Sequence, residues 1–93
     1  MGTYDDLRVG IIRECEVTVF KEADLTGYRE HAYETSWGDD TVIVLRDHWD
    51  GETIVDSTLS IERDQCEPVV VAQDGVIRDL ALFNQLQALF LAL

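Results

Sequence analysis

Residues 28–61 hold the pattern that most constrains the fold, because three runs with apolar residues are separated by two short turn signals. The runs are residues 28–37, 41–49 and 52–61, and the breaks are Gly38-Asp39-Asp40 and Asp50-Gly51. Asp-Gly between two such runs is a strong hairpin signal, since both central residues of a type I′ turn need positive φ. The stretch therefore predicts a three-stranded antiparallel β-meander.

The second turn also predicts how the last two strands pair. A two-residue loop at Asp50-Gly51 places Trp49 opposite Glu52, and counting outward places Val42 opposite Leu59. One face of the sheet then carries the residues that we expect to pack on a helix: Val42, Val44, Val55, Leu59 and Ile61. Trp49 and Ile54 fall on the opposite face, where they are only partly covered and available for an interface.

The segments on either side of the meander have weaker patterns. Residues 4–14 put apolar side chains on one helical face, but Gly10 and two β-branched isoleucines weaken a helix, so helix and strand both stay open. Residues 16–22 alternate in the way a fourth strand does. Residues 64–74 fit either a helix or a short strand containing three consecutive valines, and we favour the helix.

Residues 76–93 predict a C-terminal helix with more apolar surface than one core contact needs. One stripe consists of Leu82, Leu86, Leu89 and Leu93, and a second stripe beside it consists of Val76, Leu80, Phe83 and Phe90. One stripe packs on the sheet, and the other is covered by residues 62–74, by a second copy or by a partner. The leucine stripe is the candidate homodimer interface, because its spacing of four, three and four residues suits helix pairing.

Together these segments predict one small α+β domain spanning residues 1–93. It has an antiparallel meander of three to four strands, with the C-terminal helix, alone or with a second helical segment, packed on one face. Cys15 and Cys66 lack C-x-x-C spacing, so we expect free thiols in a reducing compartment, although a single bridge between them stays open. Without a secretory signal or a membrane-spanning stretch, the protein is expected to be cytoplasmic.

Charge sets this sequence apart from an average globular chain. Nineteen Asp and Glu face seven Lys and Arg, which gives a formal net charge of −12. Such a balance repels nucleic acid and anionic lipid and attracts basic surfaces. Three interpretations stay open: the acidity binds a basic partner, it only keeps the surface solvated, or it reflects adaptation to high salt.

Acidic pairs two residues apart give the partner-binding hypothesis its physical content. On an extended strand such carboxylates point the same way, about 6–7 Å apart, which is comparable to successive phosphates along a nucleic-acid strand. A row of them could imitate a phosphate backbone and occupy the groove of a nucleic-acid-binding protein. The candidate partner-binding residues are the acidic turn tips and two apolar neighbours: Asp39, Asp40, Trp49, Asp50, Glu52 and Ile54.

The sequence contains no strong catalytic or cofactor motif. There is no glycine-rich phosphate loop, no G-x-S-x-G and no H-E-x-x-H. His31 and His48 with Asp47 or Glu30 could hold a metal only if three ligands converged, so we predict no metal and no cofactor.

We therefore expect a non-enzymatic module that docks onto a protein with a basic surface and binds neither nucleic acid nor a membrane. The alternative from another class is an assembly protein that dimerises, or joins a complex, through its C-terminal helix.

Overall fold

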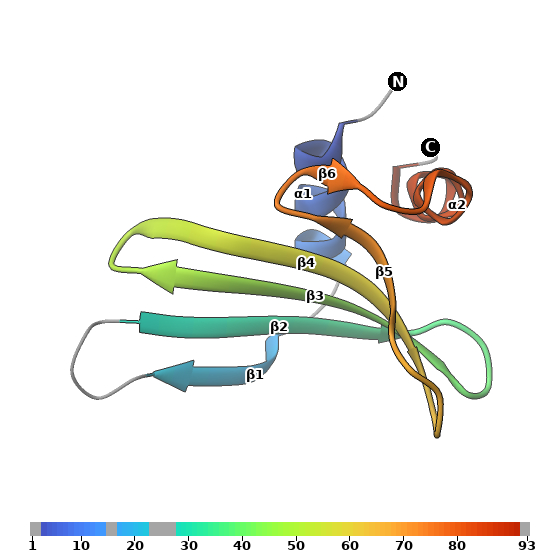
Figure 1. Cartoon of the computed structure of the whole chain (residues 1–93), viewed down its shortest axis with the longest axis horizontal. Helices are drawn as coiled ribbons and strands as arrows, with labels where there is room; N and C mark the ends of the chain where they lie inside the picture. The colour runs from blue at the N-terminus through green and yellow to red at the C-terminus, as the bar shows by residue number, and fades with distance from the viewer. Residues whose placement is uncertain (1–2, 15–16, 23–27, 92–93) are drawn as a thin grey trace.

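A computed structural model describes residues 3–14, 17–22 and 28–91 of the chain. The elements in these residues follow one another as a helix, six strands and a second helix (Figure 1). They are α1 (Tyr4–Glu14), β1 (Val17–Glu22), β2 (Tyr28–Ser36), β3 (Thr41–Asp50), β4 (Thr53–Arg63), β5 (Val69–Gln73), β6 (Val76–Ile77) and α2 (Leu80–Leu91).

The strands form one antiparallel sheet in which spatial order follows chain order, from β1 to β6. The predicted α+β fold, with a meander and a C-terminal helix, is confirmed, and the sheet is larger than the three or four strands expected. The helix favoured over residues 64–74 was wrong, because Val69–Gln73 is strand β5. Its three consecutive valines are β-branched and suit an extended backbone better than a helix.

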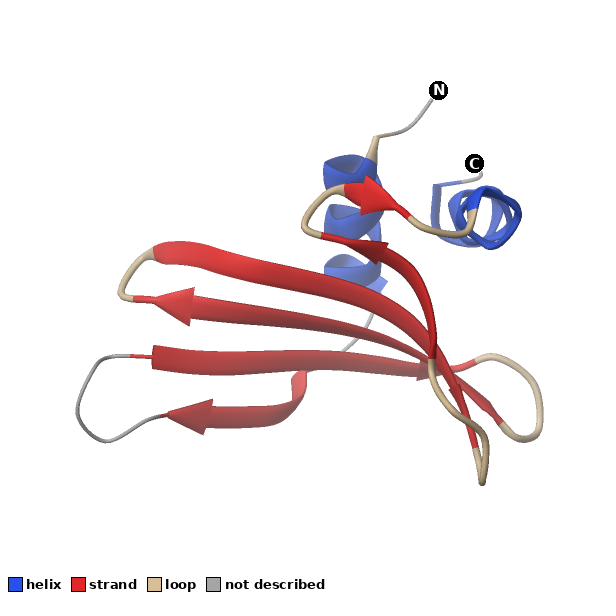
Figure 2. Cartoon of the chain, in the orientation of Figure 1, coloured by secondary structure: helices blue, strands red, loops and turns tan. Residues whose placement is uncertain are grey.

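Both helices cover the same side of the sheet (Figure 2). We call that side the helix side and the opposite one the open face. The core lies between the helices and the sheet, and its most deeply buried aliphatic residues, all at 0% exposure, are Leu7, Ile11, Ile43, Leu45, Leu59, Val71 and Leu86. Burial of one such side chain contributes roughly 1.5–3 kcal/mol, so this layer is the main source of stability. In the described residues, neither helix is long and apolar enough to cross a membrane.

Residues 4–14, which the sequence left open between helix and strand, form α1. Thr3 caps the helix: its hydroxyl accepts a hydrogen bond from the Asp6 amide (3.2 Å), and its own amide donates to the Asp6 carboxylate (3.1 Å). Gly10, which weakened the helix prediction, is explained by packing against α2. A Cβ at this position would lie 3.0 Å from Leu91 Cδ2 and 3.4 Å from the Phe90 carbonyl oxygen. Glycine therefore lets the two helices approach closely.

The predicted pairing of β3 with β4 was wrong. Asp50 still belongs to the strand and pairs with Thr53, so the loop is Gly51-Glu52 rather than Asp50-Gly51. A bulge between His48 and Trp49 then shifts the register once more.

The new register changes which residues of β3 face the core. Leu59 pairs with Leu45 rather than with Val42, and Ile61 pairs with Ile43. Leu59 and Ile61 do face the core as expected, but Ile43 and Leu45 replace Val42 and Val44 there. Val55, expected in the core, is 50% exposed.

The open face carries the alternate residues of the central strands. Its floor consists of Ala32, Val44 and Ser60, each no more than 2% exposed. The longer side chains around this floor are charged or polar, namely Glu30, Glu34, Arg46, His48, Asp56 and Glu62. This face therefore combines a small, closely packed floor with an ionic surface.

Candidate protein-docking surface

A groove of about 450 Å³ lies on the open face, at the end of the sheet where β2 turns into β3. Its walls come from β2, β3, β4 and the two turns at that end: Glu34, Ser36, Gly38, Asp39, Asp40, Thr41, Val42, Val44, Glu62, Arg63 and Asp64. Five of these residues are acids and one is basic, so we call this the acidic groove.

Local chain geometry explains why the groove is acidic. The Trp37 amide donates to the Thr41 carbonyl (2.8 Å), which closes the turn, and Gly38 adopts a φ of 92° that most side chains disfavour. Asp39 and Asp40 lie at the tip of this turn and are exposed. Glu34 and Glu62 reach the same groove because strand alternation puts their side chains on the open face.

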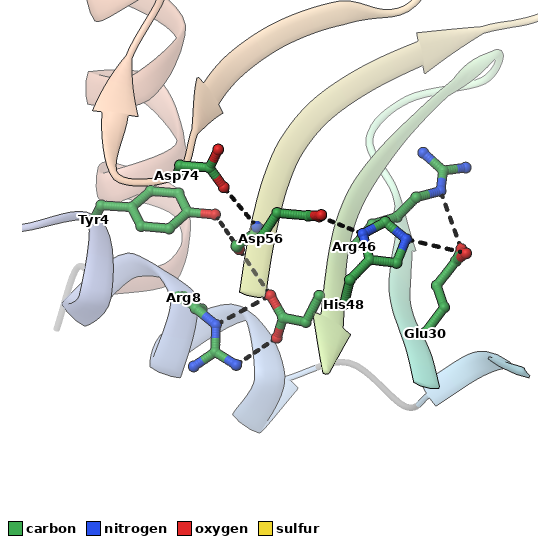
Figure 3. Close-up of polar contacts among 9 residues, drawn as sticks. Tyr4, Arg8, Glu30, Arg46, His48, Asp56 and Asp74 are labelled. Carbon is green, nitrogen blue, oxygen red and sulfur yellow. Dashed lines mark hydrogen bonds and ion pairs between the residues drawn. The ribbon is translucent and has the colours of Figure 1, made fainter. Parts of the chain in front are cut away.

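A row of ionic contacts continues from the groove along the open face, and Figure 3 shows its part from Arg46 to Asp56. Arg46 Nη1 lies 2.7 Å from Glu62 Oε2, and Arg46 Nε lies 3.8 Å from Glu30 Oε1. Glu30 Oε2 in turn lies 3.2 Å from His48 Nε2, and His48 Nδ1 contacts the Asp56 carboxylate. The row thus links β4, β3 and β2 through alternating charges.

The carboxylates around His48 change its acidity. The hydrogen bond with Asp56 is the main cause that raises the pKa of His48 above its usual value, and the contact with Glu30 adds to it. Partial burial of the ring acts in the opposite direction and is outweighed. The imidazolium form of His48 therefore persists to higher pH than that of an isolated histidine.

The groove and the row share Glu62, so they form one continuous surface, which we call the acidic face. Its acids are Glu30, Glu34, Asp39, Asp40, Asp56, Glu62 and Asp64, and its permanently charged bases are Arg46 and Arg63. With His48 protonated, three positive charges face seven negative ones. The surface therefore carries a strong excess of negative charge and can accept cationic groups.

On the helix side, a buried polar network joins α1 to β3 and β4 (Figure 3). Asp47 is 0% exposed, and Arg8 binds both of its carboxylate oxygens, with Nε 3.2 Å from Oδ1. Ser57 Oγ donates to Asp47 Oδ1 (2.7 Å), so the Tyr4 hydroxyl, 2.6 Å away, is the donor to Ser57. Burial is the main cause that raises the pKa of Tyr4, which keeps this phenol protonated as a donor.

The polar groups of this network already have partners. The Ser57 hydroxyl already donates to a carboxylate, and the Arg8 guanidinium neutralises Asp47, so neither group acts as a free nucleophile or base. The Asp74 carboxylate further holds Ser57, accepting its amide at 3.0 Å. Sequence reasoning considered Asp47 only as a metal ligand and missed this role. In the correct register, Asp47 follows Ile43 and Leu45 at strand spacing on the helix side, which marks it as a buried acid that needs a cation.

The structure separates the six predicted partner-binding residues into two groups. Asp39 and Asp40 line the acidic groove, whereas Trp49, Asp50, Glu52 and Ile54 lie at the opposite end of β3. The ten residues of β3 span about 30 Å at roughly 3.3 Å per residue, so about that distance separates the two groups. Their roles in binding remain predictions.

The sequence pattern placed Trp49 on the face opposite the core. In the structure, Trp49 lies on the helix side. The ring centroid of Trp49 is 6.1 Å from that of His31, and the Arg29 guanidinium carbon lies 5.7 Å from the Trp49 centroid. This aromatic group packs at the hairpin end of the sheet, with Trp49 only partly exposed.

The predicted leucine stripe of the C-terminal helix is divided between core and solvent. Leu86 is 0% exposed within the core, and Leu82 packs against that core. Leu89 is 52% exposed, and Leu93 lies outside the described residues. Homodimerisation through this helix remains a prediction, but Leu86 is not accessible to a second chain in this conformation.

The two histidines that could have formed a metal site do not converge. His31 pairs with Asp47 in the β2–β3 register and lies on the helix side, whereas His48 pairs with Glu30 and lies on the open face. Within residues 3–14, 17–22 and 28–91, no group of three or more potential metal ligands is present. Cys66 has an exposed free thiol, and Cys15 lies outside the described residues.

No protein-family model, curated protein or solved structure matches this chain. The geometry of the acidic face is therefore the basis for assigning a function.

Proposed function

We propose that this protein is a docking module that binds a positively charged segment or surface of another protein through its acidic face. The observation that carries the proposal is the placement of seven acidic side chains around one groove and along one open sheet face. A net charge of −12 provides long-range attraction for such a partner. The groove brings five acids and one base together at one end of the sheet, so a partner can contact several carboxylates at once.

The shape of the groove supports a partner that offers lysine or arginine side chains. Val42 is partly exposed and lines it beside the carboxylates, so an aliphatic stem can pack on this valine while its charged end reaches an acid. A protein that normally binds nucleic acid presents cations in this way, and docking would then compete with its nucleic acid. Direct binding of nucleic acid or anionic lipid is opposed by charge repulsion.

The affinity of such docking depends on several weak contacts acting together. One exposed ion pair contributes up to about 1 kcal/mol, whereas a micromolar complex requires about 8 kcal/mol. Apolar packing of the stems and displacement of ions must therefore add to the ion pairs. Because salt screens the ion pairs, we expect the affinity to fall steeply as the salt concentration rises.

The test compares two triple variants that remove the same charge. The first, Asp39→Asn, Asp40→Asn and Asp64→Asn, alters the groove, and the second, Asp5→Asn, Glu14→Gln and Glu67→Gln, alters exposed acids elsewhere. Binding of an acetylated, amidated ten-arginine peptide is measured by fluorescence anisotropy at low and high salt. Loss of three pairs should weaken binding roughly ten- to hundredfold in the groove variant. Equal weakening in both variants would reduce the effect to overall charge, and unchanged binding would refute the proposal.

A second candidate function is self-assembly, or joining a complex, through the C-terminal part of the chain. Among the described residues, most of the exposed large apolar side chains lie in this part: Val69, Val70, Val76, Ile77, Leu80 and Leu89. Residues 80–91 contain no charged side chain, so copies with a net charge of −12 can approach here with least repulsion. A Leu80→Glu, Leu89→Glu variant should lower the mass measured by light scattering if this surface forms a dimer. A wild-type protein that is monomeric at low and high salt would exclude the dimer.

A further inference from the structure

His48 lies between two carboxylates that belong to different strands of the open face (Figure 3). Its Nδ1 contacts Asp56 on β4, and its Nε2 lies 3.2 Å from Glu30 on β2. The side chain of His48 is 24% exposed, so its ring can exchange protons with solvent. Both ring nitrogens therefore face acceptors at a site that solvent reaches.

This arrangement requires two N–H groups. A neutral imidazole has one N–H and one lone pair, whereas an imidazolium has two donors. Only the protonated ring can donate to both Asp56 and Glu30. Loss of the proton turns one of these hydrogen bonds into a contact between a lone pair and a carboxylate, which is repulsive.

The groups around His48 leave its charge only partly balanced. Besides Asp56 and Glu30, Asp50 follows it by two residues along β3, while Arg46 precedes it by two and contacts Glu30. On the helix side of the same strand, Asp47 and Arg8 neutralise each other. Deprotonation of His48 therefore adds one uncompensated negative charge to the acidic face.

We propose that His48 is a proton switch that sets the affinity of the acidic face for its basic partner. The protonated ring holds Asp56 and Glu30 and reduces the negative charge, so binding is weaker at low pH. Loss of the proton frees one carboxylate and strengthens binding as pH rises. This regulation rests on the proposed docking function, because it changes the same surface.

The size of the effect follows from Coulomb's law for one unit charge. At about 8 Å, with effective dielectric constants between about 80 and 20, one charge changes affinity by about twofold to thirtyfold. The same ten-arginine peptide is a suitable probe, because its guanidinium groups do not titrate between pH 5.5 and 8.5. Its affinity for the wild-type protein should rise by this factor across that range.

Two substitutions imitate the two states of the switch. His48→Gln is neutral at all pH values and should bind as tightly at low pH as the wild-type protein does at high pH. His48→Arg keeps a positive charge and should bind weakly throughout. His31→Gln is the matched control, because His31 lies on the helix side, and this variant should keep the pH dependence of the wild-type protein.

The outcomes separate failure of the switch from failure of the docking function. If the groove variant loses binding but wild type and His48→Gln have the same pH profile, the switch is refuted and docking stands. If peptide binding changes neither in the groove variant nor with salt, the docking function is refuted, and the switch that rests on it is refuted as well. NMR titration of the wild-type His48 ring gives a test that needs no variant: titration at or below the ordinary histidine value of about 6.5 would overturn the switch.

Discussion

The contact between Arg8 and the buried Asp47 gives the strongest test of how this fold is held together. Arg8→Met keeps an unbranched apolar stem and removes the guanidinium that contacts this carboxylate. Asp47 is 0% exposed, so water cannot replace the lost partner, although Ser57 would still donate to it. Breaking a buried pair from one side typically costs about 3–5 kcal/mol. Small domains have about 5–15 kcal/mol in total, so this loss is a large part of the stability.

Urea unfolding monitored by circular dichroism measures the loss in the free energy of unfolding directly. For a domain of this size, about 1 kcal/mol corresponds to roughly 4–8 °C in Tm, so Arg8→Met should lower Tm by at least about 12 °C. Arg13→Met is the matched control on the same helix. The Arg13–Glu14 pair is 4.0 Å long with both side chains more than 60% exposed, and its loss should change stability by less than about 1 kcal/mol.

A double-mutant cycle tests whether the pair, rather than the size of the side chain, is responsible. Arg8→Met with Asp47→Leu removes both charges, and replacing a buried ion pair by apolar residues is often neutral or stabilising. The double variant should therefore be more stable than Arg8→Met alone, with a coupling energy above about 1 kcal/mol. A cost of Arg8→Met no larger than that of Arg13→Met, or simple additivity in the cycle, would refute the reasoning.

Two further predictions concern helix packing and pH. Gly10→Val should destabilise the protein by about 1–3 kcal/mol in urea unfolding, because a Cβ there already meets Leu91 Cδ2 at 3.0 Å and larger groups overpack the α1–α2 contact. Val9→Ala is the control, because Val9 is 56% exposed, and its free energy of unfolding should change little. The raised pKa of His48, caused mainly by Asp56, means that the folded state binds its proton more tightly than the unfolded chain does. The resulting stabilisation is complete below about pH 6.5 and is lost as pH rises through the folded-state pKa. His48→Gln should remove this part of the pH dependence of Tm, and an unchanged profile would contradict the assignment.

Local pattern predicted the elements whose signals lie within a few neighbouring residues. The runs between 28 and 61 form strands, and residues 80–91 form a helix, because alternation and helical spacing are properties of adjacent side chains. The helix was predicted over residues 76–93, and its start was wrong, because Val76–Ile77 is strand β6. The α1 helix was left open, because Gly10 is unfavourable in an isolated helix and is explained only by α2 packed against it. The valines of β5 were assigned to a helix, although three β-branched residues in succession already favoured the strand.

The structure brings together only part of the predicted partner-binding set. An excess of carboxylates and exposed aspartates at the turns pointed to a basic partner, and Asp39 and Asp40 do line the acidic groove. Trp49 and Ile54 were grouped with them, but they lie at the other end of β3. The contacts of His48 with Glu30 and Asp56 were not predicted, because these partners come from β2 and β4 and only the register brings them to the ring.

The sequence by itself determined the composition of this protein's surface, the meander and the C-terminal helix, since these depend on residue type and short-range spacing. Tertiary structure decided the register of β3 and β4, because one bulge after His48 and a turn displaced to Gly51-Glu52 change which side chains face the helices. That register buries Asp47 beneath Arg8 and leaves His48 on the open face. A shift of an odd number of residues moves every side chain of a strand to the other side of the sheet, so small local differences decide the whole arrangement of charge.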